Sequence, residues 1–202
     1  MITLYHAPQS RSVRPRWLLE EIGTEFTIVP IDMSKQEHKS AAHLRVHPHG
    51  QVPALTDGDL TLIESAAICL HLADRFPAAR LAPALGTPER GRYYQWIVYS
   101  VATLEPPILQ VFVNTIQLPE AERSAVQATA GREKFKEVAT VIAGGLGNGP
   151  YLLGDQFSAA DVMIGSTLAW ASFMGLLDGQ PVLASYVERL TQRPAYQRMQ
   201  AA

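Results

Sequence analysis

Residues 50–65 read GQVPALTDGDLTLIES, a pattern typical of a strand hairpin that leads into a helix. Asp57-Gly58 stands between two apolar runs and predicts strands at 54–56 and 60–63, because both central residues of such a turn need positive φ. A proline directly before a strand offers no N–H to the ladder, so Pro53 fits a strand start. If the Val52-Pro53 bond is cis, the main-chain N–H and C=O of Val52 face outward and can pair with an extended peptide.

The hairpin is followed by Glu64-Ser65, which opens a predicted helix over 64–76. The N–H groups at a helix N-terminus have no partner within the helix and suit a carboxylate. The carboxylate of Glu64 suits an amine. Together with the edge at Val52, these groups predict a site for a short peptide with a free amino acid at one end.

The residues before the hairpin predict a βαβ unit. Its parts are a strand at 2–5, a helix at 12–22 ended by Gly23, and a strand at 26–31. Two strands joined by a helix should be parallel with a right-handed crossover. The polar, histidine-rich segment 33–49 contains one short predicted helix at 41–46. The first part of the chain is therefore expected to be an α/β domain with a mixed sheet.

The residues after 78 show helical patterns only, beyond a linker at 79–86. Helices are expected at 89–116, 120–143, about 158–173, 182–192 and 195–199. Pro106-Pro107 should kink or break the first of these, since each proline removes a helix donor. Ser158 and Asp161 form a Ser-x-x-Asp capping pattern before an apolar run. We expect an α/β domain at 1–78 and an all-α domain at 87–202.

Composition excludes several classes of protein. The 202 residues carry 17 basic and 19 acidic side chains, for a net charge of −2 without long runs of one sign, so nucleic-acid binding is not expected. The single cysteine, Cys69, excludes an intramolecular disulfide and a Cys-x-x-Cys pair. No apolar stretch approaches membrane-spanning length, and the chain starts with a strand pattern rather than a signal peptide. We expect a soluble cytoplasmic protein without a membrane partner.

Several of these motifs, in this order, resemble the cytosolic glutathione transferases. The matching segments are EHKS at 37–40, PHGQVPAL at 48–55, DGDL at 57–60, the Glu64-Ser65 pair, and GDQFSAAD at 154–161. The likeness extends over essentially the whole chain. The N-terminal segments are particularly similar to the phi, theta-like and bacterial branches.

The resemblance implies a thioredoxin-like N-terminal domain that binds glutathione and a helical domain that provides the electrophile site. It implies that Val52 pairs by its main chain with the cysteinyl unit and that Pro53 carries the cis bond. It assigns Ser65 to the γ-glutamyl carboxylate and Glu64 to the neighbouring amine. The residues expected near the glycyl end are Gln51, His38 and Lys39, where a cation suits a carboxylate. A plain solvated loop is the competing interpretation for His38 and Lys39.

Glutathione chemistry requires a thiolate, and a free thiol has a pKa of about 8.5. A hydroxyl donor and a helix N-terminus lower that pKa by stabilising the anion. Ser10 and Ser12 stand where the first helix begins, and we favour Ser10, as in phi and theta-like members. Tyr5 matches the tyrosine of other branches and is the main rival. Arg11 stands where some bacterial members carry a cysteine, which favours stabilisation by charge over mixed-disulfide chemistry.

Three further groups of residues have competing interpretations. Cys69, within an apolar helix, is expected in the core. Four nearby histidines, at 38, 43, 47 and 49, raise the question of a metal, but no carboxylate or cysteine close in sequence completes a ligand set, so none is expected. The aromatic residues of the helix at 89–116 form a stripe that is typical of a core. In the family that the chain resembles, this helix also faces the electrophile and the dimer partner. Its candidate residues are Tyr93, Trp96, Tyr99, Thr103 and Phe112.

The expected function is that of a glutathione transferase. It would activate glutathione as a thiolate and conjugate it to small hydrophobic electrophiles in detoxification, as a homodimer. A glutathione-dependent peroxidase or isomerase would use the same site. The alternative from another class is a non-catalytic, glutathione-transferase-like binding or regulatory protein.

Overall fold

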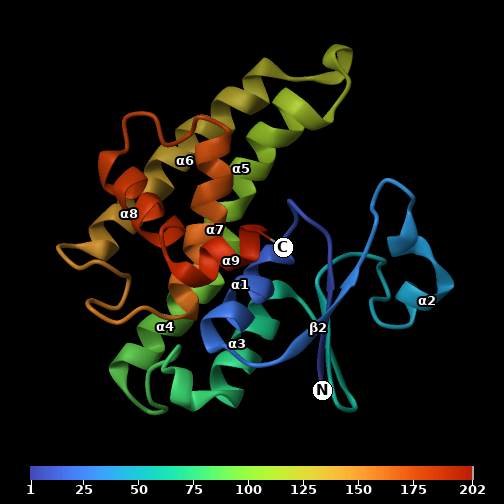
Figure 1. Ribbon diagram of the computed structural model, residues 1–202. Coiled ribbons are helices and arrows are strands. Elements are labelled where there is room, and N and C mark those ends of the chain that lie inside the picture. The colour runs from blue at the N-terminus through green and yellow to red at the C-terminus, as the bar shows by residue number, and fades with distance from the viewer. Residues whose placement is uncertain (202) are drawn as a thin grey trace. The chain divides into compact units, whose positions relative to one another are not determined.

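A computed structural model describes residues 1–201, which form two compact units (Figure 1). The first unit contains Met1–Ala82 and the chain from Gln192 onward, and the second contains Pro83–Thr191. The predicted bounds, 1–78 and 87–202, differ from this division chiefly at the last helix. That helix packs within the first unit.

The first unit is built on a mixed four-stranded sheet. Its strands are β1 (Ile2–His6), β2 (Phe26–Pro30), β3 (Ala54–Asp57) and β4 (Leu60–Ile63), in the order β2-β1-β3-β4. β1 is parallel to β2 and antiparallel to β3, and β3 is antiparallel to β4. The register pairs Leu4 with Ile28 on one side and with Leu55 on the other. The predicted βαβ unit and hairpin are both present. The turn differs from the predicted Asp57-Gly58: Asp57 pairs with Leu60, so the central residues are Gly58 and Asp59, and Gly58 alone of these three has a positive φ.

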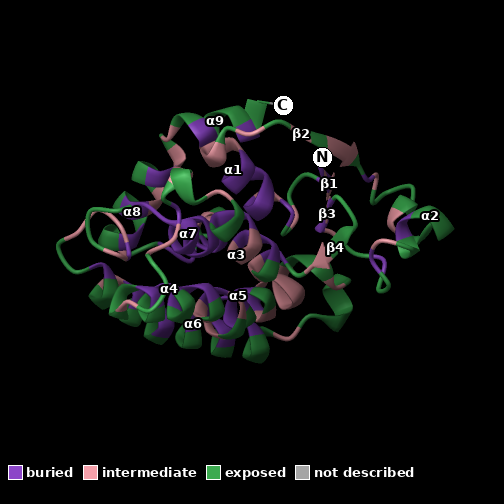
Figure 2. Ribbon diagram, turned by 90° about the horizontal axis from the view of Figure 1, so that it is seen from below, coloured by how far each residue is buried: buried purple, intermediate pink, exposed green. Residues whose placement is uncertain are grey.

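Helices cover both faces of this sheet. Figure 2 shows α1 (Val13–Ile22) and α3 (Ser65–Arg75) on one side of the strands and α2 (Ala41–Leu44) on the other. Residues of β1 alternate between the faces, so that Ile2, Leu4 and His6 are buried while the two residues between them are partly exposed. Cys69 of α3 is fully buried, and burial raises the pKa of its thiol to about 12, which confirms it as a core residue.

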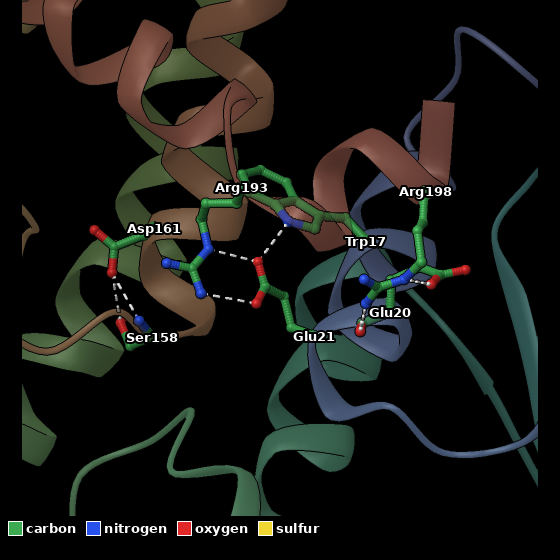
Figure 3. A network of polar contacts seen from close by, with 7 residues as sticks. All are labelled: Trp17, Glu20, Glu21, Ser158, Asp161, Arg193 and Arg198. Atoms are coloured by element: carbon green, nitrogen blue, oxygen red, sulfur yellow. Dashed lines mark hydrogen bonds and ion pairs between the residues drawn. The ribbon is translucent and has the colours of Figure 1, made fainter. Parts of the chain in front are cut away.

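The last helix, α9 (Pro194–Ala201), packs on α1 (Figures 1 and 3). The Arg193 guanidinium forms two bonds with the Glu21 carboxylate, at 2.6 and 2.8 Å, and Trp17 Nε1 donates to the same carboxylate at 3.0 Å. Arg198 Nε pairs with Glu20 at 2.9 Å. Adjacent glutamates on a surface helix usually face solvent. Glu20 and Glu21 instead join α1 to a helix far away in the sequence, which the periodicity of α1 alone does not reveal.

The second unit is all-helical within residues 83–191. Its helices are α4 (Pro88–Tyr99), α5 (Glu105–Phe112), α6 (Ala125–Leu146), α7 (Ala159–Phe173) and α8 (Pro181–Thr191). α7 is the most buried and packs against α4 and α8 (Figure 2). The predicted capping box at its start is present, with Ser158 and Asp161 each bonding the other's backbone. This box fixes the start of the central helix.

The prolines at 106 and 107 do not break the long helix. Helical structure continues from Pro88 to Gln117, with a π-helical turn at Ser100–Leu104 directly before α5 and another at Val113–Gln117. A π-helical turn is wider than an α-helical one and can accommodate the two prolines, which donate no backbone hydrogen bond. Such turns bend a helix without ending it. The predicted break is therefore absent, and a π-helical turn precedes the two prolines instead.

This continuous helix corrects a second expectation. Its 30 residues are long and apolar enough, by length and composition, to cross a membrane, with a window of mean hydropathy 1.3. The buried residues of its face include Ile97, Leu104 and Ile108, and the helix packs on α6 and α7. A helix in the core of a helical domain meets the same criteria.

The bounds of α6 also differ from the predicted 120–143. Residues Glu120–Glu122 form a single 3₁₀ turn, and the helix starts only after Ser124, whose side chain accepts from the Gln127 N–H. It continues through Gly144 and Gly145 to Leu146. A Cβ on Gly145 would lie 2.2 Å from the Trp96 ring, whereas one on Gly144 would meet nothing within 4 Å. Gly145 thus permits a close helix contact rather than ending a helix.

These two neighbouring glycines allow a matched test of packing. We expect Gly145→Ala to destabilise the protein by about 1–3 kcal/mol, because the added methyl group overpacks against Trp96. We expect Gly144→Ala to stabilise it by about 0.5–1 kcal/mol, because alanine favours a helix interior. Urea unfolding of both variants measures the difference. Equal effects of the two substitutions would contradict the close contact.

Candidate functional site

The backbone before β3 has the features predicted for a peptide-binding edge. The Val52-Pro53 bond is cis. Within residues 1–201, neither the N–H nor the C=O of Val52 takes part in a hydrogen bond, so both can pair with a ligand. The neighbouring Gln51 C=O accepts a 2.7 Å bond from His43 Nε2, which ties this edge to α2, while the Gln51 side chain is exposed.

The start of α3 holds a second part of the site. Ser65 is buried, and its hydroxyl accepts a 3.0 Å bond from the guanidinium of Arg14, itself 3% exposed. Glu64 is exposed, has a positive φ of 72°, and makes no side-chain cap bond. A plain capping pair would use that side chain on the helix. The Glu64 carboxylate instead makes no bond to the start of α3. The buried cation next to this helix N-terminus is Arg14, and both favour an anionic ligand.

His38 and Lys39 lie in a 3₁₀ turn, Glu37–Lys39, beside Gly50. Lys39 Nζ donates to the His49 C=O at 2.8 Å. Gly50 has φ 56°, and a Cβ there would lie 2.5 Å from the His38 carbonyl oxygen, so only glycine fits. The structure therefore places both residues next to the Val52 edge. Their role toward the glycyl carboxylate stays a prediction.

The loop before α1 gathers hydroxyl groups around Ser10 and Ser12. The two Oγ atoms lie 2.7 Å apart, and Ser10 Oγ donates to the Ala7 C=O at 2.7 Å. Ser12 occupies the N-cap position of α1 but makes no side-chain cap bond. Its hydroxyl is fully buried and instead bonds His6 Nδ1 at 2.7 Å. Ser10 is half-buried, so it is the hydroxyl of this pair that a ligand can reach.

The other two candidates for thiol activation are Tyr5 and Arg11. Tyr5 follows the alternation of β1 onto the face opposite His6, and its ring meets the His43 ring edge-on at a centroid distance of 5.7 Å. Arg11 is exposed. The contacts thus bring Ser10, Ser12 and His6 together and leave Tyr5 with α2. The sequence favoured Ser10 but left Tyr5 as a rival, because the side-chain direction depends on the strand register.

Three residues of this region were missed in the sequence. His6 and Arg16 belong to the group around Ser12, with Arg16 NH1 3.1 Å from His6 Nε2, and Arg14 holds Ser65. A usable signal existed for His6: it continues the inward alternation of Ile2 and Leu4, so it is a polar residue at a core position. For the two arginines the local pattern gave none, because their partners lie on other elements.

Burial and the adjacent Arg16 charge lower the pKa of His6 from 6.5 to about 4. The native state therefore keeps His6 neutral down to about pH 4, while the unfolded chain protonates it below about pH 6.5. Between these values the unfolded state binds more protons, so stability falls as pH falls.

We expect protonation of His6 in the unfolded state to lower the free energy of unfolding by roughly 2–3 kcal/mol as the pH falls from about 6.5 to about 4. The difference in unfolding free energy between the wild-type protein and His6→Asn should therefore change as pH is lowered from 7 to 4, with the wild type losing more. Urea titrations at several pH values measure it. His71→Asn, at a half-buried histidine bonded to Asp57, is the control. A difference that does not vary with pH would contradict the lowered pKa.

The histidines at 43, 47 and 49 lie side by side. The rings of His43 and His47 stack at 6.3 Å, and the rings of His47 and His49 meet edge-on at 6.2 Å. Burial, then the neighbouring His43 and His49, lowers the pKa of His47. No group of three or more His, Cys, Asp or Glu in the described part of the chain is arranged to hold a metal ion.

The aromatic candidates on the long helix separate into two groups. Tyr93 and Trp96 are buried, and Trp96 packs on Gly145. Tyr99, Thr103 and Phe112 are partly exposed. The second unit also has a surface hollow of about 380 Å³ between the end of α6 and α8, lined in part by Tyr186 and Arg189. None of the five predicted residues lines it.

Two family models match this chain. The model for the N-terminal domain of glutathione S-transferase matches residues 1–74, and the model for its C-terminal domain matches residues 121–197. Glutathione S-transferase 1 of Zea mays is 34% identical over 91% of this chain and 87% of its own length. Glutathione S-transferase GstA of Escherichia coli O157:H7 is 28% identical over 96% of this chain and 94% of its own length.

The fold agrees with these sequence matches. The solved structure of a sphingomonad glutathione S-transferase complexed with glutathione superposes with a TM-score of 0.84 at 30% identity, covering 98% of this chain and 96% of that one. The predicted architecture, a thioredoxin-like domain followed by an all-helical one, is thereby confirmed. The relatives include plant and bacterial proteins, in agreement with the predicted branches.

Proposed function

Because this chain belongs to the cytosolic glutathione transferase superfamily, we propose that it binds glutathione, activates it as a thiolate and conjugates it to small hydrophobic electrophiles. The observation that carries this proposal is the half-buried Ser10 hydroxyl at the start of α1, in a hydrogen-bonded group that includes Ser12. A hydroxyl that donates to sulfur favours the anion over the thiol, and the α1 N-terminus adds to the effect.

Binding would use the three parts of the first unit. The peptide edge at Val52 would pair with the cysteinyl unit, which directs the sulfur. The start of α3, with Ser65, Glu64 and the buried Arg14, would hold the γ-glutamyl group. His38, Lys39 and Gln51 would lie near the glycyl carboxylate. Two anchored ends leave the thiol with little freedom, which supplies the positioning that conjugation needs.

The chemical step is a nucleophilic attack. The bound thiol releases its proton to solvent, and the thiolate forms a carbon–sulfur bond with the electrophile. With an aromatic halide the ring accepts the sulfur and then expels halide, so that charge is conserved. In the second unit the partly exposed Tyr99, Thr103 and Phe112 are the candidates for holding the electrophile, since Tyr93 and Trp96 are buried. We further propose a cytoplasmic homodimer, to be checked by sedimentation.

Retention on immobilised glutathione, thiolate absorbance of the bound cofactor against pH, and conjugation of chlorodinitrobenzene together test the proposal. We expect retention, a thiol pKa below that of free glutathione, and turnover. Retention with an unshifted thiol and no turnover would favour a non-catalytic binding protein. No retention would reject glutathione as the ligand.

Mutations should affect glutathione affinity and the pKa of the bound thiol separately. We expect Ser65→Ala to weaken glutathione binding by about tenfold to a hundredfold, because a hydrogen bond to a charged carboxylate contributes about 1.5–3 kcal/mol. The pKa of the bound thiol should not change, because Ser65 acts at the other end of the peptide. Calorimetric titration and thiolate absorbance measure the two effects. A shifted thiol pKa with normal affinity would contradict the assignment.

A further inference from the structure

Ser10 stands at the end of a chain of three buried side chains. Arg16 NH1 lies 3.1 Å from His6 Nε2, His6 Nδ1 lies 2.7 Å from Ser12 Oγ, and Ser12 Oγ lies 2.7 Å from Ser10 Oγ. Arg16 and His6 are each 4% exposed and Ser12 is fully buried. The chain thus connects an interior cation to the one hydroxyl of this group that a ligand can reach.

The proton positions in the first half of the chain follow from chemistry. A guanidinium only donates, so His6 Nε2 must accept from Arg16. The ring is then neutral with its proton on Nδ1, which agrees with a His6 pKa lowered by burial and by the Arg16 charge. His6 Nδ1–H therefore donates to Ser12 Oγ.

The second half follows from counting the positions on each hydroxyl. A hydroxyl accepts two hydrogen bonds and donates one. Ser12 Oγ already accepts from His6 and from the Ala7 N–H at 3.1 Å, so Ser10 cannot donate to it. Its own proton has two acceptors in reach, Ser10 Oγ at 2.7 Å and the Ala7 C=O at 3.0 Å, and the shorter bond goes to Ser10 Oγ. Ser10 Oγ also accepts from the Ser12 N–H at 3.2 Å. The Ser10 proton is then left for the Ala7 C=O or for a ligand.

We propose that His6 and Arg16 are positioning residues for thiol activation, which set the order of protons along Ser12 and Ser10 so that the Ser10 hydroxyl can only donate. This inference rests on the proposed function, and neither residue touches the thiol. Hydrogen bonds in series polarise one another, and here the series begins at a positive charge. The Ser10 hydroxyl is consequently a stronger donor to a thiolate than an isolated serine.

The test compares His6→Phe, which removes the donor, with His6→Asn, whose amide N–H can take the place of Nδ1–H. Thiolate absorbance of bound glutathione is followed against pH in each variant and in His71→Phe, a control that loses a hydrogen bond to Asp57 instead. We expect about tenfold less thiolate at neutral pH in His6→Phe, within about twofold of wild type in His6→Asn, and no change in the control. Glutathione affinity should be similar throughout.

Nitrogen NMR of the His6 ring in the wild-type protein decides the matter even if His6→Phe does not fold. The expected state is neutral with the proton on Nδ1, and the opposite tautomer or an imidazolium would overturn the proposal. A wild-type thiolate titration in folded His6→Phe, or equal losses in both His6 variants, would overturn it as well. Failure of the proposed function looks different: the wild-type protein would then not bind glutathione or would leave its thiol unshifted, whatever the tautomer.

Discussion

Replacing Ser10 by alanine is expected to lower kcat/KM for glutathione conjugation by about a hundredfold to a thousandfold. Loss of one donor aimed at a developing or stabilised anion in a shielded site has effects of this size. The Ser10 hydroxyl is half-buried, lies 2.7 Å from the buried Ser12 hydroxyl, and precedes the N-cap residue of α1 by two positions. The residues proposed to bind glutathione, Val52 and Ser65, are untouched by the change, so the loss should appear in kcat and in the pKa of the bound thiol more than in affinity.

Two further variants make this result specific. Tyr5→Phe removes the rival hydroxyl, which lies on the other face of β1 against His43. Ser172→Ala, at an exposed serine of α7, is a control for serine removal in general. Steady-state kinetics with chlorodinitrobenzene and thiolate absorbance are measured for all three proteins. Loss of activity in Tyr5→Phe with normal activity in Ser10→Ala would transfer the role to Tyr5.

The largest expected effect on stability is that of Asp161→Ala. This fully buried carboxylate accepts from the Leu152 N–H at 2.9 Å, the Ser158 N–H at 2.9 Å and the Tyr186 hydroxyl at 2.7 Å (Figure 3 shows its bonds to Ser158). Removing it leaves several buried donors without an acceptor, and each costs about 1–3 kcal/mol. We expect a loss of about 3–5 kcal/mol in the free energy of unfolding.

Asp178→Ala, at an exposed aspartate after α7, is the matched control and should change stability by less than about 0.5 kcal/mol. Urea denaturation monitored by tryptophan fluorescence measures both variants. If Asp161→Ala unfolds at nearly the wild-type urea concentration, the buried network does not carry the start of α7 as described.

The parts of the fold that the sequence predicted have short-range causes. Asp57-Gly58 specifies a hairpin within a few residues, and Ser158 with Asp161 specifies a helix start within four. The peptide edge before β3 follows in the same way from Pro53. Each of these signals is complete in a single segment, so no knowledge of distant elements is needed.

The parts that were missed depend on packing between distant segments. Gly145 reads as a helix end, yet it lies inside α6 because Trp96 packs against it. Glu21 reads as solvent-facing, yet it pairs with Arg193. His6 lies at the end of a strand, yet it is buried with Arg16 NH1 3.1 Å from its Nε2, a contact between two separate elements. The residues proposed to bind glutathione were accordingly predicted from short segments of sequence. For the group that activates the thiol the sequence favoured Ser10 but left Tyr5 as a rival, because the choice depends on packing between separate elements.

The position of α9 has a consequence for synthesis of the protein on the ribosome. The Trp17 ring of α1 meets the Tyr196 ring at 4.9 Å, and the arginines that pair with α1 are among the last ten residues of the chain. Domains generally fold as units while the chain is being made, N-terminal first. Here the first unit cannot be finished when residue 82 emerges, and the part of α1 that α9 covers stays exposed until the residues of α9 have been made and have left the ribosome. A nascent chain is therefore exposed to aggregation for the whole time needed to make the second unit.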